Sequence, residues 1–443
     1  MSENAVQHYL SEYERSTPVP DLYWLAEQQR AAVEAFSRSG FPTLRHEEWK
    51  YTDVRPITRR QFSTPAAAAA GPDQTLIDDA RFPDLNCHEL VFHDGRFLPE
   101  QSSLGDLPAG MIIQPLAEAL RENPALLEEN LNHILDTDKN AFTALNTAFM
   151  NGGALIHIPA GTTVDKPIHL VFLSGAMGRT TVTHPRNLIV LGANAGATVV
   201  ESFSGDNEAE YLTNSATELL LKRGAQLRHY KIQQEGAAAF HVGNIHASQK
   251  RDSRFESHSI SLGGALVRND IDVRLEEEGA EVFLNGLYIA GRQQHVDNHT
   301  RIDHLCPHTQ SEENYRGVLD GKARGVFNGK IVVHKDAQKT DARQSNANLL
   351  LSDEAEVDTK PELEIYADDV KCSHGATIGQ LDERMLFYLR SRAIDKDVAR
   401  SLLTFAFAED VISRIELKPV RARLERLAVG RLPDAELIQE FMS

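Results

Sequence analysis

The sequence predicts a mainly β protein, with a right-handed parallel β-helix between two α-helical regions. From about residue 154 to 390 the chain is a series of short apolar runs, such as ALIHIP, NLIVLG and GKIVVHK, separated by turn signals. No helical pattern of ten or more residues lies between these runs, which excludes an alternating β–α architecture. Because β-sandwiches are usually shorter than this series, a solenoid is favoured over a sandwich, which is the alternative.

Residues 1–150 are expected to form an N-terminal helical region that includes a linker near 63–75 and a short β/helical segment. Apolar residues at helical spacing predict a helix from Leu22 to Phe36, which Gly40 ends. Asp94–Gly95 follows a short apolar run and predicts a hairpin turn. Between 115 and 150, leucines recur at steps of one, three and four, which predicts a further helical stretch.

The predicted β-helix core covers 151–390, and its repeat is irregular. Its turn signals lie at Gly196, Gly224, Gly236, Gly264, Gly279 and Asp336, which are 28, 12, 28, 15 and 57 residues apart. Residues 391–443 are expected to form a C-terminal helical domain. In this domain Asp395 is the N-cap of one helix, and PDAELIQEFM forms a second, shorter helix.

Composition limits the classes of partner and the compartment. A 443-residue chain with 25% charged residues and a net charge of −18 is typical of a soluble protein that repels phosphate backbones and anionic lipid. We therefore expect no nucleic-acid or membrane partner. The polar N-terminus MSENAVQHYL and the lack of an apolar run of about 18 residues predict a cytoplasmic location. Three cysteines, an odd and sparse set, predict no disulfide framework.

The motifs of several enzyme classes are missing. The segment from Gly325 to Ile331 comes nearest to a phosphate-binding P-loop. It has one residue too few between its glycines, and Ile331 stands where the motif has a residue with a hydroxyl group. The chain is therefore not expected to be an ATPase. It contains no G-x-G-x-x-G after a strand, no H-E-x-x-H and no C-x-x-C. Zinc-protease, structural zinc-site and dithiol redox functions therefore lack support.

Cys372 and His374 are the main candidate metal ligands. They lie two residues apart, so on a β-strand both side chains point to one face. A thiolate and an imidazole suit iron or zinc, but two ligands do not complete a site, and the others would have to come from elsewhere, such as another chain. The alternative is a core cysteine beside a hydrogen-bonded histidine.

Two further groups carry weaker predictions. His304, Cys306 and His308 also alternate, but Pro307 interrupts regular strand pairing, and an exposed turn is the alternative to a metal site. In the C-terminal helix, Leu402, Leu403, Phe405 and Phe407 are a candidate partner-binding surface. Phe405 and Phe407 are about 200° apart on a helix, so one of them could face a partner. Packing of both against the β-region is the alternative.

Several segments resemble the SufB/SufD family of iron–sulfur cluster assembly proteins. They include DTKPELEIYADDVKCSHGATIGQLDERMLFYLRSRAI, VFNGKIVVHKDAQKTDARQSNANLLLS, FTALNTAFMNGGALIHIPAG and RHEEWKYTDV, and the resemblance covers nearly the whole chain. The length and the single cysteine in KCSHGAT are more similar to the SufD branch than to the SufB branch. In one departure from the family pattern, Ala393 stands where a glycine is common.

The resemblance implies a fold, partners and a cargo. It implies a right-handed parallel β-helix with helical domains at both ends, and pairing with SufB through the β-helices. It also implies binding of the ATPase SufC through the C-terminal helices. His374 would lie at the interface with SufB, near an iron ion or nascent iron–sulfur cluster that is held transiently and shared with SufB. Reduced flavin is associated with the family, but no residue pattern here indicates a flavin site.

Two alternatives and one expectation complete the sequence-based predictions. The chain could be a SufB-type paralogue, or it could be a β-helix enzyme that acts on polysaccharide, although no convincing acidic cluster on alternating strand positions supports the second. Because the sheets of a solenoid end in strands with unpaired edges, we also expect the isolated chain to form a homodimer.

Overall fold

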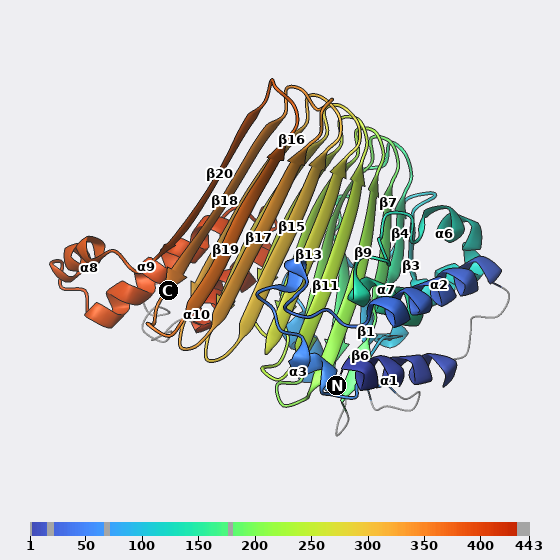
Figure 1. Cartoon of the computed structure of the whole chain (residues 1–443), viewed down its shortest axis with the longest axis horizontal. Helices are drawn as coiled ribbons and strands as arrows, with labels where there is room; N and C mark the ends of the chain where they lie inside the picture. Colours follow the sequence, from blue (N-terminus) through green and yellow to red (C-terminus); the bar gives the residue numbers. More distant parts are fainter. Residues whose placement is uncertain (1, 16–21, 66–70, 176–179, 432–443) are drawn as a thin grey trace.

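The computed structural model describes residues 2–15, 22–65, 71–175 and 180–431. Their main feature is a parallel β-solenoid made of two facing sheets, with helices at both ends of the chain packed outside it (Figure 1). From β8 to β20 successive strands alternate between the two sheets, so each strand pairs with the strand two places along the chain. The predicted fold class is therefore confirmed.

The first sheet, which we call sheet B, has ten strands in the order β2-β1-β5-β8-β10-β12-β14-β16-β18-β20. All its pairs are parallel except β1–β2, an antiparallel hairpin whose two turn residues are Asp94 and Gly95, as predicted. The strands are β1 (His88–His93), β2 (Arg96–Phe97), β5 (Ile168–Ser174), β8 (Gly196–Gly205), β10 (Gln226–Gln234), β12 (Arg254–Ser261), β14 (Glu281–Ala290), β16 (Gln310–Leu319), β18 (Asp341–Leu350) and β20 (Lys371–Gly379).

The second sheet, sheet A, has the order β19-β17-β15-β13-β11-β9-β7-β4-β3, with β6 paired to β9 as a tenth strand. Only β3–β4 is antiparallel. The strands are β3 (Ile112–Pro115), β4 (Ala154–Ile158), β6 (Thr181–Thr183), β7 (Arg186–Leu191), β9 (Tyr211–Leu221), β11 (Phe240–Gln249), β13 (Leu266–Leu275), β15 (His295–His304), β17 (Arg324–Val333) and β19 (Glu356–Ile365).

The repeat is regular, which corrects the irregular repeat predicted from the turn signals. From β8 to β20, the strands of sheet B begin 30, 28, 27, 29, 31 and 30 residues apart. Between β7 and β18, each turn from sheet A into sheet B has one residue with positive φ, and only two of these six residues are glycines: Asn194, Gly224, Asp252, Gly279, His308 and Lys339. Most of the turns therefore lack the glycine that would have indicated them.

The solenoid interior is a continuous apolar core. Leucine, isoleucine, valine and phenylalanine from both sheets fill it from β1 to β17. Phe92, Phe172 and Phe203 occupy the same register on three neighbouring strands, and their rings stack with centroid distances of 5.2 and 4.9 Å. Such stacks fix the register, because a slip by one residue would turn each ring out of the core.

The N-terminal helices cover the outer faces of the sheets. Helices α1, α2 and α7 pack on sheet A through Phe36, Phe142 and Leu212, and α4 packs on sheet B through Ile77 and Val171. The predicted helix from Leu22 is α2, which Gly40 ends with φ of 61°. The helical segments of this region are α1 (Ser2–Arg15), α2 (Tyr23–Ser39), η1 (Glu47–Trp49), α3 (Arg55–Thr58), α4 (Gln74–Ala80), η2 (Pro99–Gln101), α5 (Leu116–Glu122), α6 (Pro124–Asn130) and α7 (Ala141–Phe149).

The stretch from 115 to 150 is three short helices rather than one continuous pattern. Pro124 starts α6 at a position where proline is tolerated, and residues 131–140 between α6 and α7 are not helical. Although β1 and β3 belong to residues 1–150, they pair with the solenoid sheets. The division into regions 1–150, 151–390 and 391–443 stays a prediction.

The C-terminal helices are α8 (Glu383–Arg390), α9 (Lys396–Ile412) and α10 (Lys418–Arg431). Helices α9 and α10 bury Val411, Ile412 and Leu424 against the outer face of sheet B. The side chain of Asp395 accepts a hydrogen bond from the Asp397 amide, so the predicted N-cap is confirmed. The second predicted helix, PDAELIQEFM, lies outside the described residues. Of the helices that the structure describes, none combines the length and apolar character of a membrane span.

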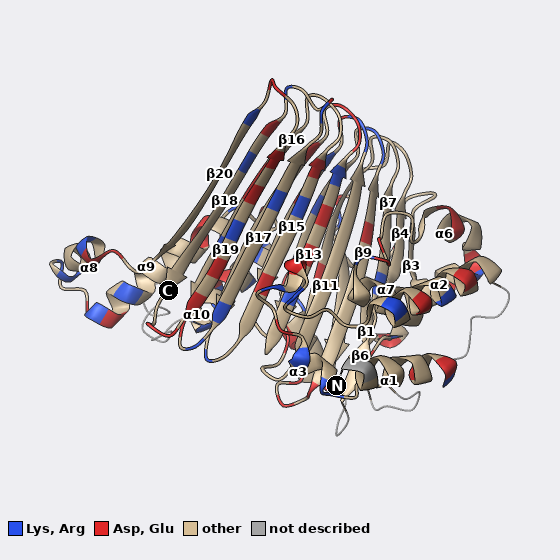
Figure 2. Ribbon diagram, in the orientation of Figure 1, with Lys and Arg blue, Asp and Glu red and all other residues tan. Residues whose placement is uncertain are grey.

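The outer face of sheet A is densely charged. Figure 2 shows blue and red bands along β13, β15, β17 and β19. Many of these charges are paired, for example Lys330 with Glu364 at 2.6 Å and Arg324 with Asp358 at 2.6 Å. Because acidic and basic side chains neutralise one another there, this face offers no single-sign field for a highly charged polymer.

Candidate functional site

The two sheets end in β19 and β20, which have no further strand beside them in the described chain. Most side chains of β20 are exposed, and those of β19 are half-buried. Core residues Ile331 and Ala342 lie one coil inside this end, and Leu363 and Cys372 cover them only in part. We call this end of the solenoid, formed by β19 and β20, the open end.

The predicted ligands Cys372 and His374 lie on β20, at the open end. Cys372 pairs in register with Ala342, and His374 pairs with Gln344. Since Ala342 is a buried core residue, both β20 side chains point toward the solenoid interior, on one strand face as predicted. Cys372 is half-buried, and His374 is exposed because no further coil covers it.

The Cys372 thiol is protonated at neutral pH. Partial burial and the carboxylate of Asp341 raise its pKa above the ordinary value. A metal ion would have to displace this proton, whereas a neutral imidazole at His374 can bind a metal through an unprotonated ring nitrogen. His374 is therefore the readier ligand of the pair.

A row of polar side chains runs from the core to His374. Glu313 on β16, Gln344 on β18 and His374 on β20 share one register position in successive coils. The amide nitrogen of Gln344 donates to Glu313, and both residues are buried. Burial raises the pKa of Glu313 to about 7, so this carboxyl is about half protonated near neutral pH. His374 is thus the exposed end of a register row whose inner members, Glu313 and Gln344, are buried and polar.

Sequence reasoning missed Glu313 and Gln344. They lie 31 residues apart, and Gln344 precedes His374 by 30, so they share a row only because one coil has that length. Neither residue belongs to a recognisable motif. A regular repeat in the turn positions would have been the signal, and the non-glycine turn residues conceal it.

The weaker metal candidates are separated by the fold. His304 is buried, and its ring nitrogens lie 2.7 and 2.9 Å from the hydroxyls of Thr309 and Ser311. The Cys306 thiol donates to the carbonyl of Glu276 at 2.9 Å, and His308 is an exposed turn residue. Among the described residues these three do not form a metal-binding group.

Exposed apolar side chains concentrate near the open end. Of the eight large apolar residues that the structure describes as exposed, six lie between Ile365 and Tyr388. A groove of about 420 Å³ separates β20 from the C-terminal helices, and Ile378, Met385, Leu403 and Phe407 are among the residues that line it. Patches of this kind are typical of surfaces that a partner covers.

The four predicted partner-binding residues of α9 are all half-buried. Leu403 and Phe407 line the groove, whereas Phe405 packs toward the cluster that holds α9 on sheet B. Phe407 also touches this cluster, and the guanidinium of Arg316 lies 4.9 Å from its ring centroid. Helix α9 thus presents one side to the sheet and part of another to the groove. Helix α8 supplies Phe387, which at 75% is the most exposed of the large apolar residues near the open end.

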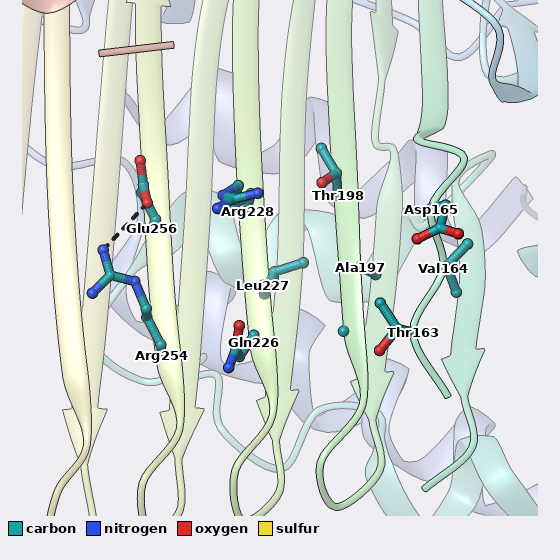
Figure 3. Close-up of a pocket in the computed structure, with 11 residues that line it drawn as sticks. Thr163, Val164, Asp165, Ala197, Thr198, Gln226, Leu227, Arg228, Arg254 and Glu256 are labelled. Atoms are coloured by element: carbon teal, nitrogen blue, oxygen red, sulfur yellow. Dashed lines mark ion pairs between the residues drawn. The ribbon is translucent and has the colours of Figure 1, made fainter. Parts of the chain in front are cut away.

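A second hollow, of about 230 Å³, lies on the outer face of sheet B (Figure 3). It contains the side chains of Arg228 and Arg254. Arg254 pairs with Glu281 at 3.0 Å and with Glu256 at 3.5 Å, and Arg228 pairs with Glu416 at 2.9 Å. Because both arginines are engaged by carboxylates, their charge is already balanced within this hollow.

Comparison with known proteins adds two family matches. The family described as "SUF system FeS cluster assembly, SufBD core domain" matches residues 172–407. The family described as "SufBD protein N-terminal region" matches residues 4–170. Together they cover most of the chain.

Individual relatives agree with these matches. An iron–sulfur cluster assembly SufBD family protein of Synechocystis is 33% identical over 410 residues, which are 91% of this chain and 90% of the relative. The iron–sulfur cluster assembly protein SufD of Escherichia coli is 32% identical over 438 residues, 98% of each chain. The SufB protein of Bacillus subtilis is 27% identical over 337 residues, 74% of this chain and 69% of the relative.

Proposed function

Because the chain belongs to the SufBD family of the SUF iron–sulfur cluster assembly system, we propose that it is a non-catalytic assembly subunit of the SufD type. The observation that carries this proposal is the open end, where inward-pointing Cys372 and His374 are left accessible beside an incompletely covered core. This geometry suits a surface that is completed by a second protein. The family assignment leaves no support for a polysaccharide-acting enzyme.

A SufD-type subunit is favoured over the SufB-type alternative. The SufD relative from Escherichia coli aligns over 98% of this chain, whereas the SufB relative from Bacillus subtilis aligns over 74% at lower identity. The proposed partner at the open end is therefore SufB. Edge strands β19 and β20 have unpaired backbone groups that another solenoid can pair with, and Ile365 and Ile378 add exposed apolar area there.

The proposed cargo is iron or a nascent iron–sulfur cluster, held transiently. It would contact His374, with Cys372 beside it, and SufB would supply the remaining ligands. Two protein ligands are fewer than the four that an iron–sulfur cluster commonly takes, which supports a shared site. A cytoplasmic location stays a prediction, and nothing in the described residues supports a flavin site.

The proposed docking surface for the SufC ATPase is the groove between β20 and helices α8 and α9. Helix α8 exposes Met385, Phe387 and Tyr388, and their apolar area is large enough to anchor a partner in a groove. Truncation at residue 394 is a poor test of this docking, because α9 and α10 also bury Val411, Ile412 and Leu424 against sheet B. Point substitutions on α8 leave that packing intact.

The test is co-expression of the tagged chain with SufB and SufC, followed by purification through the tag. We expect the unmodified chain to retain both proteins. Phe387→Ser should reduce SufC recovery at least several-fold and leave SufB recovery and the melting temperature unchanged, since Phe387 is 75% exposed. Tyr23→Ser, at a residue that is 84% exposed on α2, is the matched control and should retain SufC. If the unmodified chain retains neither SufB nor SufC, the proposed assembly role is wrong.

A further inference from the structure

A cysteine, a glutamate and a histidine converge at the opposite end of sheet B from Cys372 and His374. Glu89 on β1 and His169 on β5 are direct neighbours in register, and Cys87 precedes Glu89 by two residues. Leu90 and Leu170, the residues that follow Glu89 and His169, belong to the solenoid core, so the three polar side chains lie on the outer face. One ligand atom from each lies within 4.8 Å of the other two, which is the one such group in the described chain.

Neighbouring residues orient both buried ligands. The Arg81 Nε donates to Glu89 Oε1 at 2.8 Å, which leaves Oε2 facing His169 Nδ1 at 3.2 Å. On the other side of the ring, His169 Nε2 lies 2.8 Å from the Ser202 hydroxyl. The ring also packs on Phe82, with a centroid distance of 5.2 Å. Metal-binding histidines and carboxylates are usually held by such outer hydrogen bonds.

The donor set selects the class of metal. One thiolate, one imidazole and one carboxylate favour a borderline divalent cation over calcium or magnesium, which prefer oxygen ligands. Three protein ligands leave a fourth position for water or an external ligand. Glu89 and His169 are buried, and Cys87 is half-buried, so the fourth position would be reached from the side of Cys87.

We propose that Cys87, Glu89 and His169 form a binding site for a borderline divalent cation such as iron(II), zinc(II) or cobalt(II). The site is separate from the open end, because seven strands of sheet B follow β5 in the order that ends at β20. It therefore does not depend on the proposed assembly function. The competing explanation is a purely structural hydrogen-bonded chain through Arg81, Glu89, His169 and Ser202.

Cobalt(II) titration of the metal-free full-length protein tests the site, because a thiolate ligand gives a charge-transfer band in the near ultraviolet. We expect one equivalent to bind with this band, and zinc(II) to displace it. Cys87→Ser should abolish the band and keep the melting temperature of the free protein.

Two matched cysteine variants separate this site from the others. Cys372→Ser and Cys306→Ser should both keep the cobalt band at full intensity, because neither thiol belongs to the group. His169→Gln tests the imidazole and should lower the affinity at least tenfold. The proposal is wrong if the parent protein gives no thiolate band, or if the band survives Cys87→Ser and disappears with Cys372→Ser.

Discussion

At the scale of single residues, His374 is accessible and lies at a defined register position on β20. It is exposed, whereas its register neighbour Gln344 is buried and bonded to Glu313. An exposed histidine contributes little to stability, because its removal leaves no cavity and no unpaired buried group. A role for His374 in cargo binding can therefore be separated from a structural role by experiment.

His374→Ala should keep the fold and assembly with SufB and SufC, yet fail to rescue cluster formation in a strain that lacks the native gene. Since exposed substitutions usually change stability by less than about 0.5 kcal/mol, the melting temperature should move by less than about 2 °C. Cys372→Ser should be milder, and Ser373→Ala on the outer strand face is the matched control. A clearly destabilised His374→Ala protein, or one that rescues normally, would refute the ligand role.

Glu313 makes stability depend on pH near neutrality. Its pKa rises from the ordinary carboxyl value to about 7 in the folded protein, so folding favours the protonated form. The contribution of this group is fully present below the unfolded pKa of about 4.3 and is lost as pH rises through 7. A pKa shift of this size corresponds to a contribution to the free energy of unfolding on the order of 3 kcal/mol at most.

Glu313→Gln should therefore flatten the fall in stability between pH 5 and pH 8. Urea unfolding at both pH values measures the effect. The variant should gain stability relative to the parent at pH 8 but not at pH 5. Glu312→Gln, on the outer face of the same strand and paired with Arg414, is the control and should leave the pH profile unchanged. An unchanged profile in Glu313→Gln would contradict the buried-carboxyl explanation.

At the scale of elements, turns and helix ends could be predicted from the sequence, whereas the coil length and the pairing of distant residues could not. Gly40, Asp94–Gly95 and Asp395 were predicted correctly because each acts through hydrogen bonds and dihedral angles within a few residues. The coil length was missed because His308 and Lys339 adopt positive φ without a glycine signal. Glu89 and His169 are 80 residues apart, so only the strand register brings them together.

The connection between α8 and α9 contains a residue under backbone strain. Ala393 adopts φ of 63°, in the left-handed region that favours glycine. The left-handed conformation costs a residue with a Cβ roughly 1–2 kcal/mol, and part of this cost is offset by the lower entropy of alanine in the unfolded chain. The strain is local to this connection.

Ala393→Gly should consequently stabilise the protein, by roughly 0.5–1 kcal/mol. Chemical denaturation of the two proteins side by side measures this difference. Ala406→Gly, an exposed alanine inside α9, should have the opposite sign and cost about 1 kcal/mol, because glycine is a poor helix former. Destabilisation by both substitutions would show that Ala393 is not strained.

At the scale of the whole molecule, the solenoid is closed at one end and open at the other. Hairpin β1–β2 and the antiparallel pair β3–β4 end the two sheets on the N-terminal side, whereas β19 and β20 are left without a covering element in the described chain. The exposed apolar side chains Ile365, Tyr366 and Ile378 lie on the open side. Any protein that covers this end gains both backbone pairing and apolar burial.

In the absence of SufB, the isolated chain should form a homodimer through the open end. Light scattering across a range of micromolar concentrations should show a monomer–dimer equilibrium. Ile365→Lys should shift it toward monomer, because Ile365 is 42% exposed at the end of β19. Leu44→Lys, at a residue that is 47% exposed in the N-terminal region, should leave it unchanged. A strict monomer at tens of micromolar would contradict edge pairing.

The regular coil also has a consequence for synthesis. Every strand from β8 onward pairs with a strand that left the ribosome about 30 residues earlier. Each new coil can therefore pair with a coil that is already folded while translation continues. From β8 onward no strand has to wait for a distant segment, and loop-closure costs stay small and uniform. The coil formed last is the one that carries Cys372 and His374. A nascent chain therefore presents the proposed cargo-binding surface only after the rest of the solenoid is in place.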